Sequence, residues 1–168
     1  PIGNGIGPVL EIIDIIKILD SEQKGPRDLE DKSLFLAGEL LEMTGKAGKG
    51  KGLEMAKRIL YSGKAFEKFK EIIKAQEGNL KRLKFGEYKR SILSKNSGIV
   101  HEVNNKKINS LARVAGCPLD KSAGLYLHKH LHDEVKKGEK LITIYAESKL
   151  RLNEAARFFE KTKPIIIK

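Results

Sequence analysis

The sequence has 168 residues, and its 33 lysine and arginine side chains exceed its 22 aspartate and glutamate side chains, which gives a formal net charge of +11. This length allows one ordinary domain or two small ones, and 40% hydrophobic residues suffice for a core. No apolar run reaches the ~20 residues of a membrane-spanning helix, and the single Cys117 excludes an intramolecular disulfide. One cysteine fits a reducing cytoplasm, where we expect the protein to act.

The chain opens on a glycine-rich stretch, PIGNGIGPVLE, that lacks an initiator methionine. Glycine-rich loops that lead into helices usually serve a ligand or ion site. We therefore expect the chain to be the C-terminal piece of a longer protein. The loop leads into a predicted helix over Val9–Leu19, which is apolar at nearly every position and is expected to be buried. Its polar residues, Glu11, Asp14 and Lys17, should share one stripe.

Three more helices are predicted in the first half. Pro26 suits the start of an element, and Asp28 is the expected cap of a helix that ends near Thr44. Two further helices, Leu53–Tyr61 and Lys64–Gln76, are separated by a Ser-Gly break. The expected core-facing residues are Leu34, Ala37, Leu40 and Leu41 on the first of these helices, and Phe66, Phe69, Ile72 and Ile73 on the last.

The loop Gly45–Gly52, GKAGKGKG, nearly matches the phosphate-binding P-loop pattern. It lacks the final Ser or Thr, because position 52 is glycine, and it follows a helix instead of a strand. We interpret it as a mobile connection between helices.

The second half changes from helical to alternating periodicity. Strands are predicted over Tyr88–Ser94, Ile99–Val103, Leu125–Leu131, Leu141–Ala146 and Ile165–Ile167. Helices are predicted over Lys106–Ala115, ending at Gly116, and over Leu150–Glu160. This order of strands and helices indicates an α+β fold.

The net charge also changes along the chain. Residues 1–80 carry 13 basic and 13 acidic side chains, whereas residues 81–168 carry 20 and 9. We therefore predict two domains, 1–80 and 81–168, with a boundary near Asn79–Phe85. The basic half leaves open a non-catalytic assembly or nucleic-acid-binding module, for which RNA binding would fall steeply with salt. A lysine-rich solvated surface is favoured, because the cations are scattered and lack interleaved aromatic residues.

Several short segments, in order and over nearly the whole chain, resemble the pyrimidine-nucleoside phosphorylase family, which includes thymidine phosphorylases and archaeal AMP phosphorylases. They are Pro1–Glu11, GPRDL from Gly25, SGKAFEKF from Ser62, AQEGN from Ala75 and GLYLHKH from Gly124 through Glu139. Gly7-Pro8 is more similar to the archaeal AMP phosphorylase branch. The resemblance implies that residues 1–80 are the helical C-terminal part of the catalytic domain. It also implies that residues 81–168 are a small α/β-hammerhead or barrel-sandwich-like C-terminal domain.

The resemblance implies a pentosyltransferase as the parent enzyme. Phosphate, the co-substrate, attacks the anomeric carbon of a nucleoside or nucleoside 5′-monophosphate, and free base and a sugar 1-phosphate are released. The family's phosphate-binding and basic catalytic residues match no segment here, so we expect the chain to hold no catalytic residue and to be inactive alone. We also expect a homo-oligomer that uses neither a membrane nor a required organic cofactor.

Some family members hold a monovalent cation with loop carbonyl oxygens and one carboxylate. Matched residue by residue, these positions are Ile2 and Gly5 for the carbonyls and Asp14 for the carboxylate. Asp14 is shorter than the glutamate of those relatives. The alternative, which we favour, is that Asp14 only belongs to the polar stripe of its helix.

Histidine and cysteine are two further residue types that could supply chemistry. His128, His130 and His132 alternate, and on one strand they would share a face, where zinc binding would need further ligands. A half-exposed strand is the favoured interpretation. Cys117 could act as a nucleophile only beside a base, and a small, half-buried structural residue is favoured.

Overall fold

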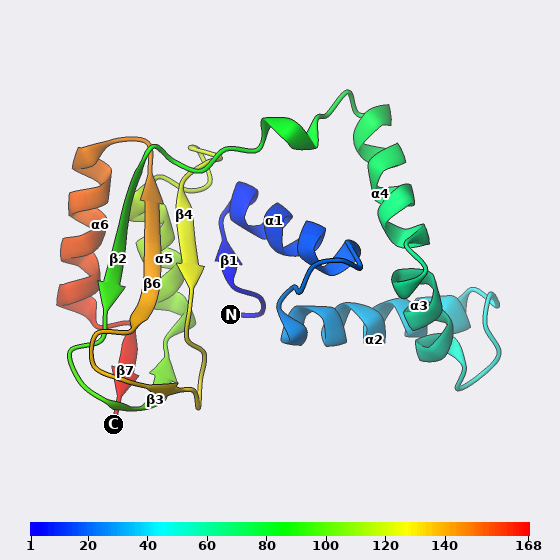
Figure 1. The fold of residues 1–168 in the computed structure, drawn as a ribbon, viewed down its shortest axis with the longest axis horizontal. Helices are drawn as coiled ribbons and strands as arrows, with labels where there is room; N and C mark the ends of the chain where they lie inside the picture. Colours follow the sequence, from blue (N-terminus) through cyan, green and yellow to red (C-terminus); the bar gives the residue numbers. More distant parts are fainter. The chain divides into compact units, whose positions relative to one another are not determined.

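The computed structural model describes all of residues 1–168, which divide into two compact units. The sheet unit comprises Pro1, Gly3–Ile12 and Leu83–Lys168, and the helical unit comprises Ile2 and Ile13–Arg82 (Figure 1). The units therefore divide between Arg82 and Leu83, and again within the first helix, α1 (Pro8–Leu19). The fold is α+β, as predicted.

The helical unit contains the second half of α1 and four further helical elements. These are α2 (Arg27–Met43), α3 (Gly52–Tyr61), α4 (Lys64–Ala75) and the 3-10 turn η1 (Leu80–Arg82). Its small core consists of Leu34, Ala56 and Leu60, against which Ile18, Leu19, Ala37, Leu41 and Ala65 pack. None of the helices in the chain combines the length and apolar character that crossing a bilayer requires.

Several expectations for these helices were wrong. Helix α2 begins at Arg27, so Asp28 lies within the first turn instead of at the cap position, and its carboxylate accepts from the neighbouring Leu29 N–H. Leu40 is 60% exposed. No residue of α4 is buried, and Ile72 is 47% exposed. The helical period identified the apolar faces correctly, but this small unit contains too little structure to cover them.

Helix α1 also departs from its expected pattern. Asp14, assigned to a polar stripe with Glu11 and Lys17, is 1% exposed, whereas Glu11 is exposed. Ile15 is 38% exposed although the whole helix was expected to be buried. Burial on α1 therefore does not follow residue polarity.

The sheet unit contains two antiparallel sheets. The larger has the order β1-β4-β6-β2, formed by β1 (Gly5–Ile6), β4 (Gly124–Leu127), β6 (Lys140–Ala146) and β2 (Tyr88–Leu93). The smaller has the order β5-β3-β7, formed by β5 (Glu134–Val135), β3 (Gly98–Val103) and β7 (Ile165–Ile167). The sequence did not predict β1 or β5, because two-residue strands leave no periodic pattern.

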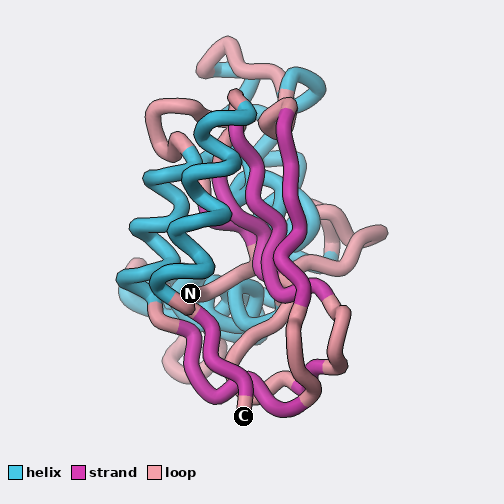
Figure 2. The backbone as a smooth tube through the Cα atoms, turned by 90° about the vertical axis from the view of Figure 1, so that its left-hand side faces the viewer, coloured by secondary structure: helices cyan, strands magenta, loops and turns pink.

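Helices α5 (Asn105–Ala115) and α6 (Lys149–Thr162) pack on one face of the larger sheet, where Figure 2 shows two helices beside the long strands. Asn104 and Ser148 cap them, each accepting from the backbone N–H three residues ahead. The core beneath them includes Ile108, Leu111, Leu125, Ile142 and Ile144, all fully buried. Ser91, Thr143 and Tyr126 lie in one row across the larger sheet and alternate with the buried Ile142, Ile144 and Leu125, so they lie on its opposite face.

Candidate functional sites

The glycine loop is the segment Gly3–Gly7 at the start of the sheet unit. Gly5 lies opposite Tyr126 in the pairing of β1 with β4. Gly7 has φ +118°, and a β carbon there would come within 2.6 Å of the Ala123 carbonyl oxygen, so only glycine fits without strain. The Gly7 N–H donates to the Glu11 carboxylate at 3.1 Å, which ties the loop to the first turn of α1.

The three residues predicted to hold a monovalent cation are divided between the two units. Ile2 and Asp14 belong to the helical unit, and Gly5 belongs to the sheet unit. Ile2 is exposed, whereas Asp14 is almost fully buried. Backbone carbonyls and a buried carboxylate are oxygen donors of the kind that hard cations prefer, so the donor chemistry fits the predicted ion.

The side chain of Asn4 connects the glycine loop to the end of β4. Its Oδ1 lies 2.7 Å from His130 Nε2, and its Nδ2 donates to the Tyr126 hydroxyl at 3.1 Å. The Asn4 carbonyl oxygen accepts from the Leu127 N–H at 2.8 Å. Sequence reasoning missed this cluster, because 126 residues separate Asn4 from His130.

A second cluster of polar side chains lies next to Tyr126, formed by Ser91 and Thr143 on neighbouring strands of the same sheet and by His128 directly after β4. Thr143 is 5% exposed, and its hydroxyl lies 3.0 Å from Ser91 Oγ and 2.8 Å from His128 Nε2. The rings of Tyr126 and His128 meet edge to face with centroids 5.1 Å apart. Partial burial, with a smaller effect of Lys140, lowers the pKa of His128, which favours its neutral form.

The histidines do not share one strand face as predicted. Strand β4 ends at Leu127, and His132 adopts φ +72° within the following turn. His128 and His130 each contact a different partner, Thr143 and Asn4. No group of three or more His, Cys, Asp or Glu side chains in residues 1–168 is arranged to hold a metal ion. The strand prediction was wrong at its end because turn geometry overrode the alternating pattern.

Cys117 is half-buried and unpaired, in keeping with the structural role favoured for it. Burial, assisted by the nearby Glu11 charge, raises the pKa of the thiol. A raised pKa suppresses the thiolate that nucleophilic attack requires.

The Gly45–Gly52 loop connects α2 to α3, as predicted, but an internal carboxylate holds it in place. Gly50 N–H and Gly52 N–H donate to the two oxygens of Glu42 at 2.9 and 2.8 Å. These hydrogen bonds lower the pKa of the Glu42 carboxyl. These two backbone donors of the loop are thus already used within the chain.

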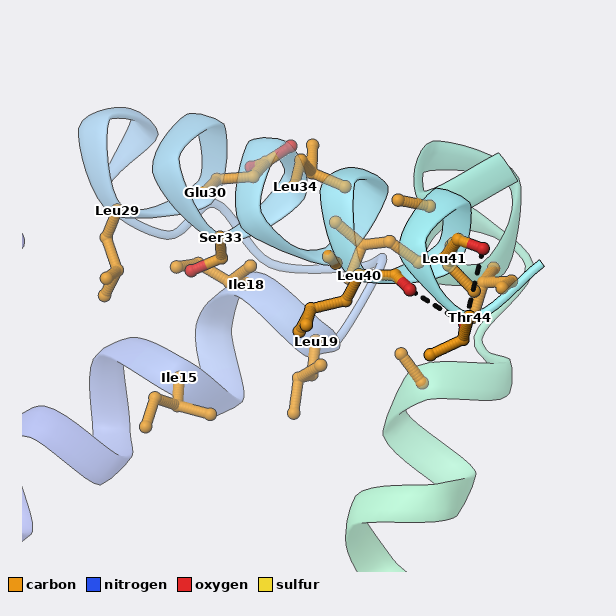
Figure 3. A pocket seen from close by; sticks show the side chains of 15 residues that line it. Ile15, Ile18, Leu19, Leu29, Glu30, Ser33, Leu34, Leu40, Leu41 and Thr44 are labelled. Carbon is orange, nitrogen blue, oxygen red and sulfur yellow. Dashed lines mark hydrogen bonds between the residues drawn. The ribbon is translucent and has the colours of Figure 1, made fainter. Parts of the chain in front are cut away.

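An apolar groove of about 690 Å³ runs along the helical unit between α1, α2 and α3 (Figure 3). Ile15, Ile18 and Leu19 line it from α1, and Leu29 and Leu40 line it from α2. Of its polar lining residues, Glu30 already accepts from the Tyr61 hydroxyl at 2.7 Å and Thr44 donates to the Leu40 carbonyl at 2.8 Å. The groove therefore offers mainly apolar surface, and no lysine, arginine or histidine lines it.

Comparisons with known proteins match nearly the whole length of this chain. Residues 99–165 match the model of the pyrimidine nucleoside phosphorylase C-terminal domain. The chain is 44% identical over 171 aligned residues to an AMP phosphorylase of Methanococcoides burtonii, covering 99% of this chain and 34% of the relative. An AMP phosphorylase of Methanosarcina mazei is 45% identical with the same coverage.

A putative thymidine phosphorylase of Legionella pneumophila is 40% identical over 167 residues, covering 99% of this chain and 32% of the relative. The chain thus spans about one third of the length of the curated relatives it matches. The matches cover both the helical and the sheet segments. They confirm the resemblance drawn from the sequence, which is to the C-terminal portion of the pyrimidine-nucleoside phosphorylase family.

Proposed function

We propose that this chain is the C-terminal part of a phosphorylase that cleaves the N-glycosidic bond of a nucleoside or nucleoside 5′-monophosphate. The observation that carries the proposal is the similarity of 99% of the chain to proteins named AMP phosphorylase at about 44% identity. In the proposed reaction a phosphate oxygen bonds to the anomeric carbon as the bond to the base breaks. The base leaves and takes up a proton, and a sugar 1-phosphate remains.

The proposed substrate is a nucleoside 5′-monophosphate such as AMP, with thymidine as the alternative. Gly7-Pro8 and the several AMP phosphorylases among the relatives support AMP. The Legionella relative named for thymidine supports the alternative. The proposed setting is the cytoplasm, and the proposed assembly is a homo-oligomer.

Within this enzyme the helical unit would complete the catalytic domain, and the sheet unit would form the C-terminal domain. Ile2, Gly5 and Asp14 are the residues proposed to hold a monovalent cation. The chain spans about one third of the length of its relatives, which supports the proposal that catalysis needs residues outside it.

The test compares this chain with the full-length protein that carries it. Full-length protein incubated with AMP and phosphate should release adenine and ribose 1,5-bisphosphate, whereas the 168-residue chain should release no base above background. Base release by the chain alone would contradict its proposed inactivity. A full-length protein that cleaves thymidine and ignores AMP would reverse the proposed substrate.

A further inference from the structure

The glycine loop consists mainly of a residue type whose backbone is flexible. Three of its five residues are glycines, and Gly3 and Gly7 adopt φ values of +77° and +118°. Glycine has the largest backbone freedom to lose on ordering. Asn4 and Ile6 are the two residues of the loop that carry side chains, so Asn4 supplies its polar side-chain contacts.

The donors in the contacts of the Asn4 side chain with His130 and Tyr126 can be assigned. An amide oxygen can only accept, so His130 Nε2 must carry the hydrogen in its contact with Asn4 Oδ1. The amide nitrogen then donates to the Tyr126 hydroxyl oxygen. These roles are assigned from the hydrogen-bond network, and they make His130 a donor that a conservative substitution can mimic.

His130 belongs to a turn that several hydrogen bonds hold in place. Its N–H donates to Asp133 Oδ2 at 2.6 Å, and the Asp133 N–H donates back to the His130 carbonyl at 3.1 Å. This turn is bonded to β3 in both directions, from Val100 N–H to the Asp133 carbonyl and from His132 N–H to the Val100 carbonyl, each at 2.9 Å. A side chain supported in this way can hold a flexible partner in one geometry.

We infer that His130 and Tyr126 are positioning residues that fix the glycine loop through the side chain of Asn4. The role of the loop as an oxygen-donor segment for a monovalent cation rests on the proposed function. The hydrogen bonds that His130 and Tyr126 make with Asn4 would orient the backbone carbonyl groups that precede and follow Asn4 in the loop. Residues near the end of β4 would in this way set the cation affinity of the glycine loop, which lies more than a hundred residues earlier in the sequence.

Hydrogen exchange in this chain tests the positioning directly. His130→Phe keeps a ring and removes the donor, His130→Gln keeps a donor, and Tyr126→Phe removes the hydroxyl. Loss of one hydrogen bond should accelerate exchange of the Gly3–Ile6 amides about tenfold in His130→Phe and Tyr126→Phe. His130→Gln should retain the wild-type rate, as should the matched control His101→Phe, which changes an exposed side chain on β3.

Two results would overturn the inference in this experiment. One is an unchanged rate at Gly3–Ile6 in both His130→Phe and Tyr126→Phe. The other is equal acceleration of the Ile142–Ile144 amides in central β6, because that would indicate a general loss of stability.

A second experiment separates this inference from the proposed function. In full-length protein, His130→Phe should raise the KCl concentration needed for half-maximal AMP phosphorolysis about tenfold, with the rate at saturating KCl retained, and His130→Gln should restore the wild-type value. An unchanged KCl dependence in an active enzyme would overturn the positioning role. Wild-type protein that releases no base would refute the proposed function, while the exchange result would still decide whether His130 holds the loop.

Discussion

Gly38 and Gly52 face each other where α2 packs against α3, and a β carbon on Gly52 would lie 2.1 Å from the Gly38 carbonyl oxygen. A β carbon on Gly38 would lie 2.7 Å from the backbone nitrogen of Leu53. Both obstacles are backbone atoms, which cannot rotate away. The two helices therefore approach more closely than any larger residue at either position would allow.

Gly38→Ala should destabilise the protein by about 1–3 kcal/mol, the usual range for overpacking. The clash should outweigh the helix-propensity gain of about 1 kcal/mol from replacing glycine with alanine. Urea unfolding followed by circular dichroism measures the difference. Gly48→Ala is the control, because a β carbon there meets nothing within 4 Å and should change stability by less than about 0.5 kcal/mol. A stabilised Gly38→Ala variant would show that the helices can separate without cost.

Glu42→Gln should release the Gly45–Gly52 loop, because a carboxamide has one acceptor oxygen for the two amides that Glu42 binds. Trypsin should then cut faster after the loop lysines Lys46, Lys49 and Lys51. The Glu39→Gln variant changes an exposed charge on the same helix and should be cut at the wild-type rate.

The same contact gives a pH signature. The pKa of Glu42 is lower in the folded protein than in the unfolded chain. The stability that the ionised carboxylate contributes is therefore present above the ordinary glutamate pKa and is lost as the pH falls through the lowered value. The amide resonances of Gly50 and Gly52 should report that titration. A titration at or above the ordinary value would contradict the assigned hydrogen bonds.

His128 should make the sheet unit less stable in mild acid. Its folded pKa is lowered, so the unfolded chain binds more protons as the pH falls from the ordinary value of 6.5 toward the folded pKa. Thermal unfolding should therefore shift to lower temperature between about pH 7 and pH 5. His128→Gln should flatten this dependence, while His101→Gln, which changes an exposed histidine on β3, should leave it in place. Identical pH profiles for wild type and His128→Gln would show that another group is responsible.

The apolar surface of α1 should promote self-association of this chain. Ile15 is 38% exposed and borders the apolar groove, and apolar surface left in water costs roughly 25 cal/mol per Å². Ile13→Lys or Ile16→Lys should weaken a dimer or higher oligomer, and Lys17→Ala should not. Sedimentation at concentrations on the order of tens of micromolar measures the oligomeric state, because the fraction of associated chains depends on protein concentration. A strictly monomeric wild-type chain would contradict this prediction.

Local patterns predicted most of the elements. Strand β7 coincides with the predicted Ile165–Ile167, and helices α3 and α4 each differ from prediction by one residue at one end. Hydrophobic period, caps and glycine breaks act over a few residues, so they can be recognised in the sequence alone.

Features that depend on distant partners were missed. Strand β1 exists because Gly5 pairs with Tyr126, and the Asn4–His130 contact depends on the same pairing. Burial of Asp14 likewise reflects tertiary packing that its helical position did not reveal. The exposed stripe of α4 could be located from the sequence, but whether anything in the chain covers it could not.

The pairing of β1 with β4 makes the sheet unit discontinuous in sequence. A recombinant piece cut at the change of charge, beginning near residue 81, would lack Gly3–Ile12 and would leave one edge of β4 unpaired. An unpaired edge invites association with another strand. Because β1 and β4 lie more than a hundred residues apart, this edge should also be among the last parts of the sheet to close during folding, when the ends of a long intervening segment must first meet.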